Sequence, residues 1–266
     1  MSGLGLIAGE GELPLLVARS AADAGLRIIA VALSPSVTPG LSAFADRVYR
    51  IGPDRPEDIV GVLSSEGVDQ AVMAGKVWKE RMFEDGAIRA GVDLCMGDNP
   101  ARNDDAILRA FVERLEGAGI NVREQTEFLG QAIARTGLLA SREPDAREWG
   151  DILFGFQVAK YIAGADIGQT VVVKNRVVLA VEALEGTDAA ILRGGRLGRE
   201  GAVVVKVSKP AQDMRFDVPT IGKETLRTMH SVGATVLGVE AGKTFIVDID
   251  GVSRLADQMG ISIVGL

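Results

Sequence analysis

The sequence predicts an α/β protein with two domains, a Rossmann-like parallel sheet in the N-terminal domain and a mixed sheet in the C-terminal α/β domain. In the first half, short apolar runs alternate with helical runs, a pattern typical of a doubly wound parallel sheet. In the second half, two valine-rich runs are separated by a very short connection, which indicates an antiparallel hairpin. We divide the chain into residues 1–140 and 141–266, because the polar stretch SREPDAREWGD begins there.

The elements of the first half follow from the alternation of these runs. We expect strands at GLIAG, which starts at Gly5, and over 26–33 and 69–74, and helices over 15–25, 56–67 and 103–119. The last of these helices has the strongest pattern, because its apolar residues recur three and four positions apart. Asn103 or Asp104 is a suitable N-cap for it.

The second half alternates less regularly. A helix is expected over 152–163, followed by the two hairpin strands within 169–175 and 176–183. Later strands are expected over 202–207, 234–240, 243–248 and 261–266, and later helices over 220–232 and 251–259. A shorter helix is expected to open at EGTD, residues 185–188.

Composition and charge narrow the function. The chain has 266 residues, of which 47% are hydrophobic, and its formal net charge is −7. Such an acidic chain disfavours nucleic acid as the main partner. One cysteine and one histidine exclude an intramolecular disulfide and do not furnish a structural zinc site. No apolar run is long enough for a spanning helix and no secretory signal is visible, so we expect a cytoplasmic protein, with contact at a membrane surface still open.

Two glycine-containing turns lie where a parallel sheet binds ligands. Gly9, Glu10 and Gly11 follow the first strand, and backbone N–H groups at such a turn receive phosphates. The turn lacks the third glycine of a dinucleotide fingerprint, so NAD is weakly supported, and a tight turn with no ligand remains open. Gly75 and Lys76 follow the strand at 69–74, where Lys76 would meet a phosphate unless the segment is an ordinary solvated loop.

The EGTD turn offers a second kind of site. Thr187 or Asp188 caps the helix that begins there, and the remaining N–H groups point beyond the helix end. Flanked by Glu185, this turn would bind sugar hydroxyls or a phosphate with Mg²⁺. The alternative is an acidic capping turn without a ligand.

The stretch KVSKPAQDMRFDVPTIG, residues 206–222, is the densest in reactive side chains. Its three cations would neutralise two phosphates, and its two aspartates would hold Mg²⁺ or activate water; these residues are Lys206, Lys209, Arg215, Asp213 and Asp217. Cations, a metal and a carboxylate that orients water are the parts needed to hydrolyse a phosphate ester. The alternative is a charged surface loop.

Four motifs occur together and in order: GLIAGEGELP, DIGQTVVV, VLAVEALEGTDAAI and KPAQDMRFDVPTIG. With them the chain resembles the LpxI family of UDP-2,3-diacylglucosamine pyrophosphatases over almost its whole length. The resemblance implies Mg²⁺-dependent hydrolysis of UDP-2,3-diacylglucosamine in lipid A biosynthesis, by water attack at the α-phosphorus. The products would be UMP and 2,3-diacylglucosamine 1-phosphate (lipid X). It also implies a ligand held between two domains and a homodimer.

The resemblance makes Asp217, within FDVPTIG, the catalytic carboxylate, while Asp213 and Asp217 are the candidate metal ligands that the residues of this stretch offer. Residues expected to bind substrate are Gly9, Glu10, Gly11, Gly75, Lys76, Gln169, Glu185, Gly186, Thr187, Asp188, Lys206, Lys209, Gln212, Arg215 and Thr220. Because the substrate carries two acyl chains, an apolar cleft and a peripheral encounter with the inner membrane are expected as well.

Two other functions remain open from the sequence. A nicotinamide-dependent oxidoreductase would use the first domain, although no acidic residue ends the second strand. A non-catalytic regulator would bind a uridine nucleotide and release no UMP.

Overall fold

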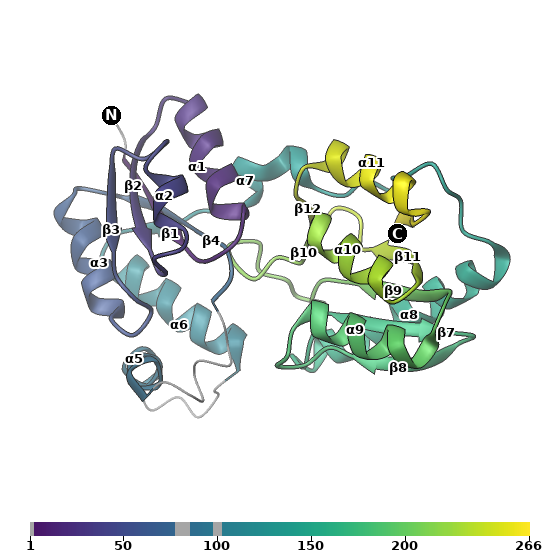
Figure 1. The fold of residues 1–266 in the computed structure, drawn as a ribbon. Helices are drawn as coiled ribbons and strands as arrows, with labels where there is room; N and C mark the ends of the chain where they lie inside the picture. Colours follow the sequence, from purple (N-terminus) through teal and green to yellow (C-terminus); the bar gives the residue numbers. More distant parts are fainter. Residues whose placement is uncertain (1–2, 78–85, 98–102) are drawn as a thin grey trace. The chain divides into compact units, whose positions relative to one another are not determined.

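The computed structural model of the protein describes residues 3–77, 86–97 and 103–266. The chain forms two compact units, each with its own sheet (Figure 1). The first unit comprises Met1–Gly130 and Asp213–Asp217, and the second comprises Gln131–Gln212 and Val218–Leu266. The expected α/β class, with a parallel sheet and a mixed sheet, is confirmed. The first unit ends earlier than residue 140, however, and includes a segment from the second half of the chain.

The sheet of the first unit is wholly parallel, with strand order β3-β2-β1-β4-β5. Its strands are β1 (Gly3–Ala8), β2 (Arg27–Ala32), β3 (Arg47–Arg50), β4 (Gln70–Ala74) and β5 (Asn121–Val122). Its helices are α1 (Leu13–Asp23), α2 (Thr38–Leu41), α3 (Pro56–Ser65), α5 (Gly86–Met96), α6 (Asp104–Gly117) and α7 (Thr126–Leu129). Asn103 caps α6 through its side chain, as one of the two expected alternatives.

The core of the first unit follows from the alternation of side chains along its strands. Ile7, Ile29 and Val31 lie in one apolar cluster with residues of α3 and α6, and their strand neighbours point to the opposite face. In Figure 1 α1 covers that opposite face. Helices on both faces explain why β1 and β2 are apolar along almost their whole length.

The second unit contains a six-stranded mixed sheet, in the order β6-β13-β11-β9-β7-β8. Its strands are β6 (Gly137–Leu138), β7 (Thr170–Lys174), β8 (Val177–Val181), β9 (Ala202–Lys206), β11 (Ala234–Val239) and β13 (Ser262–Gly265). A separate pair consists of β10 (Thr220–Ile221) and β12 (Phe245–Ile246). The helices are α8 (Ala146–Gly164), α9 (Thr187–Gly198), α10 (Lys223–Ser231) and α11 (Ile249–Met259), with a 3-10 turn, η1, at Gly130–Ala132.

Two apolar clusters flank the larger sheet of the second unit. Ile152 and Ala159 of α8 pack on one face, and Ile191, Leu226 and Val252 of α9, α10 and α11 pack on the other. The valines of β7 and β9 alternate between the two clusters. This arrangement leaves the strand ends, and the loops that follow them, as the places where polar side chains gather.

The polar stretch expected as the boundary belongs to α8 and the turn before it. Asp145 and Glu148 form a capping box, so the helix begins at Ala146 and not near residue 152. Glu148 is buried and accepts hydrogen bonds from Arg142 and Thr235. Burial alone would raise the pKa of Glu148, but these hydrogen bonds outweigh burial and lower it overall. The charged residues of this stretch therefore stabilise the start of α8 in the second unit.

Candidate active site

The first group of expected site residues lies at the carboxyl ends of β1 and β4, two adjacent parallel strands. The backbone of Gly9 donates to Ala74 at 2.8 Å, and Glu10 and Lys76 exchange two backbone hydrogen bonds, each 2.8 Å long. The loops that carry Gly9 and Lys76 are thus paired where open α/β sheets bind ligands.

The glycines of these loops have a steric reason. A Cβ on Gly75 would lie 2.7 Å from the backbone of Gly9, and Gly75 has a φ of +92°. A Cβ on Gly9 would meet the backbone oxygen of Lys76 at 2.7 Å. Close approach of two backbones therefore accounts for both glycines before any ligand is considered. Gly11, with a φ of +99° and open space around it, is required only by its backbone conformation.

The segment Asp213–Asp217 belongs to the first unit although it lies far along the chain. Phe216 is 1% exposed and lies in the apolar cluster that contains Ile7 and Phe111. The backbone N–H of Gln125 donates to the carbonyl of Met214 at 3.0 Å. The catalytic candidate Asp217 follows Phe216 directly, so its backbone is fixed to the first unit.

Two expected site residues in this segment bind each other. Both carboxylate oxygens of Asp213 accept from the guanidinium of Arg215, at 2.8 to 3.2 Å, and Arg215 also reaches Glu116 at 2.9 Å. Burial raises the pKa of Asp213, but the hydrogen bonds from Arg215 outweigh it and lower the pKa overall. Asp213 therefore stays ionised and holds the guanidinium of Arg215 in place.

Asp217 adopts an unusual backbone conformation. Its φ is +49°, in the left-handed region that non-glycine residues seldom occupy and that aspartate tolerates better than most. Its side chain is partly exposed, whereas Phe216 before it and Val218 after it are buried. The backbone on both sides of this partly exposed carboxylate is therefore held by buried neighbours.

A second group of expected residues lies at one edge of the larger sheet in the second unit. Thr170, at the start of β7, pairs with Lys206, at the end of β9, and Glu182 donates its backbone N–H to Thr170 at 2.9 Å. The antiparallel pairing of β7 with both neighbours therefore brings the residues around Gln169, Glu182 and Lys206 to the same edge.

The side chains at this edge form a chain of hydrogen bonds. The ammonium of Lys206 donates to the Thr187 hydroxyl at 2.9 Å and to the Thr220 carbonyl at 3.0 Å. Thr187 donates to Glu182 at 2.9 Å, and the backbone N–H of Gln169 reaches the same carboxylate at 3.3 Å. The structure thus gathers four of the expected residues around Glu182, which was not among them.

The start of α9 lies beside this network. Gly186, with a φ of +79°, is its N-cap and supplies no side-chain cap, so the first backbone N–H groups of α9 have no side-chain acceptor from that residue. Glu185 turns back to Arg193 at 2.6 Å; burial raises its pKa, and the hydrogen bond from Arg193 reverses the shift and lowers it. Asp188 lies exposed in the first turn.

The beginning of the 206–222 stretch is clamped within the second unit. Lys209 is buried and forms an ion pair with Asp166 at 2.6 Å, and its backbone N–H donates to Gln212 at 3.2 Å. Glu240 accepts from Lys160 at 2.9 Å and from the hydroxyl of Ser208 at 2.8 Å. Lys209 and Gln212 therefore help to fold this stretch, whatever else they bind.

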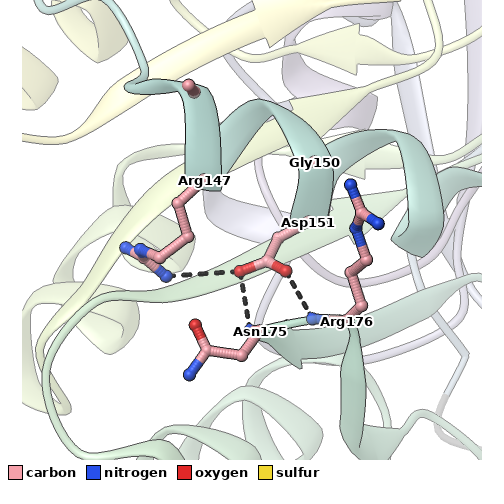
Figure 2. A pocket seen from close by; sticks show the side chains of 6 residues that line it. Arg147, Gly150, Asp151, Asn175 and Arg176 are labelled. Carbon is pink, nitrogen blue, oxygen red and sulfur yellow. Dashed lines mark hydrogen bonds and ion pairs between the residues drawn. The ribbon is translucent and has the colours of Figure 1, made fainter.

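A hollow of about 280 Å³ lies elsewhere in the second unit, beside the hairpin turn of β7 and β8 (Figure 2). The carboxylate of Asp151 accepts the backbone N–H groups of Asn175 and Arg176 at 2.9 and 2.6 Å, and Arg147 at 3.3 Å. Asn175 and Arg176 have φ of +51° and +57°, as in the turns that favour hairpins. Asp151 thus holds the turn, and the hollow contains none of the expected site residues.

The donor set for a metal is limited in the part of the chain that the structure describes. No group of three or more histidine, cysteine, aspartate or glutamate side chains lies there in a metal-binding arrangement. Of the two expected ligands, Asp213 accepts hydrogen bonds from Arg215 at both of its carboxylate oxygens. Among the described residues, no helix is long and apolar enough to cross a membrane.

Comparison with known proteins gives matches over the whole chain. A family model for the LpxI N-terminal domain matches residues 3–132, and one for the LpxI C-terminal domain matches residues 135–264. The chain is 32% identical over 278 residues to the UDP-2,3-diacylglucosamine pyrophosphatase LpxI of Caulobacter vibrioides, covering 100% of this chain and 98% of that protein.

Two of the matching solved structures are only weakly similar to the chain. The biotin carboxylase subunit of pyruvate carboxylase matches with a TM-score of 0.30 and 14% identity, over 70% of this chain and 39% of that one. Leucoanthocyanidin reductase with NADPH, from Vitis vinifera, matches with a TM-score of 0.24 and 20% identity, over 44% of this chain and 45% of that one. The chain spans less than half of either structure, and neither likeness informs function.

The chain has two α/β units, and the two domain models of one enzyme family match it almost from end to end. These matches define a hydrolase that acts on a pyrophosphate bond. The chain belongs to the LpxI family.

Proposed function

We propose that the protein hydrolyses UDP-2,3-diacylglucosamine to UMP and 2,3-diacylglucosamine 1-phosphate, lipid X, in lipid A biosynthesis. The observation that carries this proposal is the match to the Caulobacter pyrophosphatase over the whole length of both chains. The charged groups described above are compatible with a substrate that bears two phosphates.

The sheet edge of the second unit would bind phosphate oxygens. The Lys206 ammonium lies 2.9 Å from Thr187, the first residue of α9, whose opening N–H groups lack a side-chain cap. A helix N-terminus with an adjacent cation is a favourable place for an anion. Glu182 would hold the Thr187 hydroxyl in place, so that Lys206 presents its remaining proton outward.

Asp217 would orient the water and accept its proton. The water oxygen attacks the α-phosphorus, the bond from that phosphorus to the bridging oxygen breaks, and the bridging oxygen leaves with lipid X. The proton removed from water passes to the carboxylate of Asp217, the role of a general base in phosphoryl and nucleotidyl transfer. Its fixed backbone favours this role because a general base must be held within hydrogen-bond reach of the water.

Mg²⁺ remains part of the proposal. Mg²⁺ is commonly held by one or two carboxylates together with substrate phosphates, and Asp217 is a carboxylate of the kind it takes. The ion would neutralise charge on the pyrophosphate. Asp213 holds the guanidinium of Arg215 through both carboxylate oxygens, and we assign its main role to the orientation of Arg215.

The substrate class implies where the enzyme works. Because two acyl chains hold the substrate in a bilayer, we propose that a cytoplasmic enzyme meets it at the inner face of the inner membrane, as a peripheral protein. A homodimer is proposed on the same family resemblance.

Release of UMP from purified substrate tests the proposal. We expect Asp217→Asn to lower kcat by about 100- to 10,000-fold, as for loss of a general base. Asparagine also tolerates a positive φ, so the fold should be retained. The matched control is Asp248→Asn, a second aspartate with a left-handed backbone, where activity should stay within about twofold because asparagine also caps helices.

Three results would count against this proposal. Wild-type protein that binds a uridine nucleotide and releases no UMP would indicate a regulator. A saturable response to NAD(P)H would favour the oxidoreductase. Full turnover after removal of divalent ions by a chelator would exclude the role of Mg²⁺.

A further inference from the structure

The chain changes units on both sides of the catalytic candidate. Gln131–Gln212 belong to the second unit, Asp213–Asp217 belong to the first, and the chain returns to the second at Val218. Asp217 is therefore the last residue of a short insertion into the first unit. The motif that contains Asp217 lies in the C-terminal half of the sequence, but Asp217 itself belongs to the N-terminal unit.

One side chain supplies the apolar anchor of this insertion. Phe216 is among the largest fully buried side chains, with 1% exposure. Its cluster includes Ile7 and Met73, which lie next to the carboxyl ends of β1 and β4. Burying a phenylalanine is favourable by about 1.5–3 kcal/mol, whereas the partly exposed neighbours Met214 and Arg215 bury less apolar surface.

Polar contacts fix the same segment from its other end. Gln125, 3% exposed, donates its backbone N–H to Met214 at 3.0 Å and its side-chain amide to the Met73 carbonyl at 2.7 Å. One buried residue therefore ties the insertion to the end of β4. Arg215 adds a bond to Glu116 at 2.9 Å.

The backbone of Asp217 needs such anchoring. A non-glycine residue at a φ of +49° persists only when its surroundings determine its conformation. Phe216 and Val218 are buried on either side, at 1% and 7% exposure, and they hold the chain in different units. Release of Phe216 would let Asp217 relax and follow the second unit instead.

We infer that Phe216 is a positioning residue, which fixes the Asp217 carboxylate to the strand ends of the first unit. The inference rests on the proposed function of Asp217. Phe216 touches no reacting atom; it acts on kcat by keeping Asp217 in place, and its apolar cluster contains neither Lys206 nor Thr187. A displacement of about 1 Å in a catalytic group costs on the order of 100-fold in rate.

The test compares two phenylalanines of one core. Phe216→Leu and Phe216→Ala are set against Phe111→Leu and Phe111→Ala, since Phe111 lies in the same cluster at 9% exposure. UMP release is measured with full-length protein well below the unfolding temperature of each variant. We expect kcat to fall at least about tenfold for Phe216→Leu with KM within about threefold, and kcat to stay within about threefold for Phe111→Leu.

Amide exchange gives a readout that does not depend on activity. The N–H of Gln125 donates to Met214, so its exchange reports release of the insertion. It should quicken at least about tenfold in Phe216→Leu relative to Phe111→Leu, while the amide of Ile29 in β2 exchanges alike in both.

The outcomes separate the inference from the proposed function. An inactive wild type, or an active Asp217→Asn, overturns the function, and the exchange measurement still decides whether Phe216 anchors the insertion. Equal losses of kcat, or equal exchange at Gln125, in the Phe216 and Phe111 variants overturn the positioning role. Failure of Phe216→Leu to fold, where Phe111→Leu folds, would make Phe216 a core residue without a separable role and would also overturn it.

Discussion

Gly75 shows how a single position combines a backbone requirement with a steric one. It has a φ of +92°, and a Cβ there would lie 2.7 Å from the backbone of Gly9. Gly67 has a φ of +70° but open space around it. Alanine at Gly67 should cost about 1–2 kcal/mol of unfolding free energy from backbone strain, and alanine at Gly75 should cost clearly more.

Urea unfolding of the two variants measures the difference. Equal losses for Gly75→Ala and Gly67→Ala would show that the loops after β1 and β4 separate easily, and that their pairing is not rigid. A larger loss at Gly75 would mean that the loop pairing through Glu10 and Lys76 contributes to stability.

Individual site residues were predictable from the sequence to different degrees. Gln169, Thr187 and Thr220 were expected from the motifs and Lys206 from the density of charge in residues 206–222, and the structure brings the four together. Glu182 was missed as a site residue, because a carboxylate after a strand gives no sign of its partners; its position directly before ALEGT was the one available signal. The pairing of Asp213 with Arg215 depends on a local turn that charge counting does not reveal.

At the level of elements, one carboxylate holds the end of a helix against an edge strand. Glu66, the C-cap of α3, binds Tyr49 and Arg47 of β3 and Arg27 of β2. The hydrogen bond from Tyr49, followed by those from the arginines, lowers the pKa of Glu66 from 4.5 to about 2. Because the folded pKa is lowered, ionised Glu66 stabilises the fold above about pH 4.5, and this stabilisation is lost as the pH falls towards 2.

Glu66→Gln should therefore lower the thermal unfolding midpoint near pH 7, and the gap to the wild type should narrow steadily below pH 4.5. Circular dichroism melts from pH 3 to 7 measure this. Asp58→Asn is the control, because its pair with Arg55 is more than half exposed on both sides and should matter little. A gap that does not change with pH would contradict the role of the ionised carboxylate.

Elements with strong apolar periodicity were predictable, and those that depend on pairing were not. The strands at β1, β2, β4, β7, β8 and β9 follow apolar runs. β3, with the sequence RVYR, is a charged strand at the edge of the described sheet, next to β2, so its sequence lacks the signal of a buried strand. β10 takes Thr220–Ile221 out of the expected helix because these residues pair with β12.

At the level of the whole molecule, the two-unit α/β fold was predictable from the order of its runs, but the exchange of chain between the units was not. Nothing local to RFDV distinguishes a buried phenylalanine of the first unit from one of the second. Membership of a core is decided by tertiary packing, which here places Phe216 in the same apolar cluster as Ile7, Met73 and Phe111.

A fragment of residues 1–130 should consequently be less stable than the first unit in the intact chain. Loss of the buried Phe216 corresponds to about 3–5 kcal/mol, the cost of truncating a core aromatic. Dye binding to exposed apolar surface and urea unfolding measure this. Joining residues 212–218 to the fragment through a flexible Gly/Ser linker should restore most of the loss; no recovery would contradict the packing of Phe216.

The same crossing has a consequence for biosynthesis. Residues 1–130 emerge from the ribosome first, yet the core that they build stays open at one place until Phe216 has followed. At translation rates of about 5–20 residues per second, this delay lasts several seconds. The N-terminal unit is thus made first and finished late, and the same event that seals its core brings Asp217 to it.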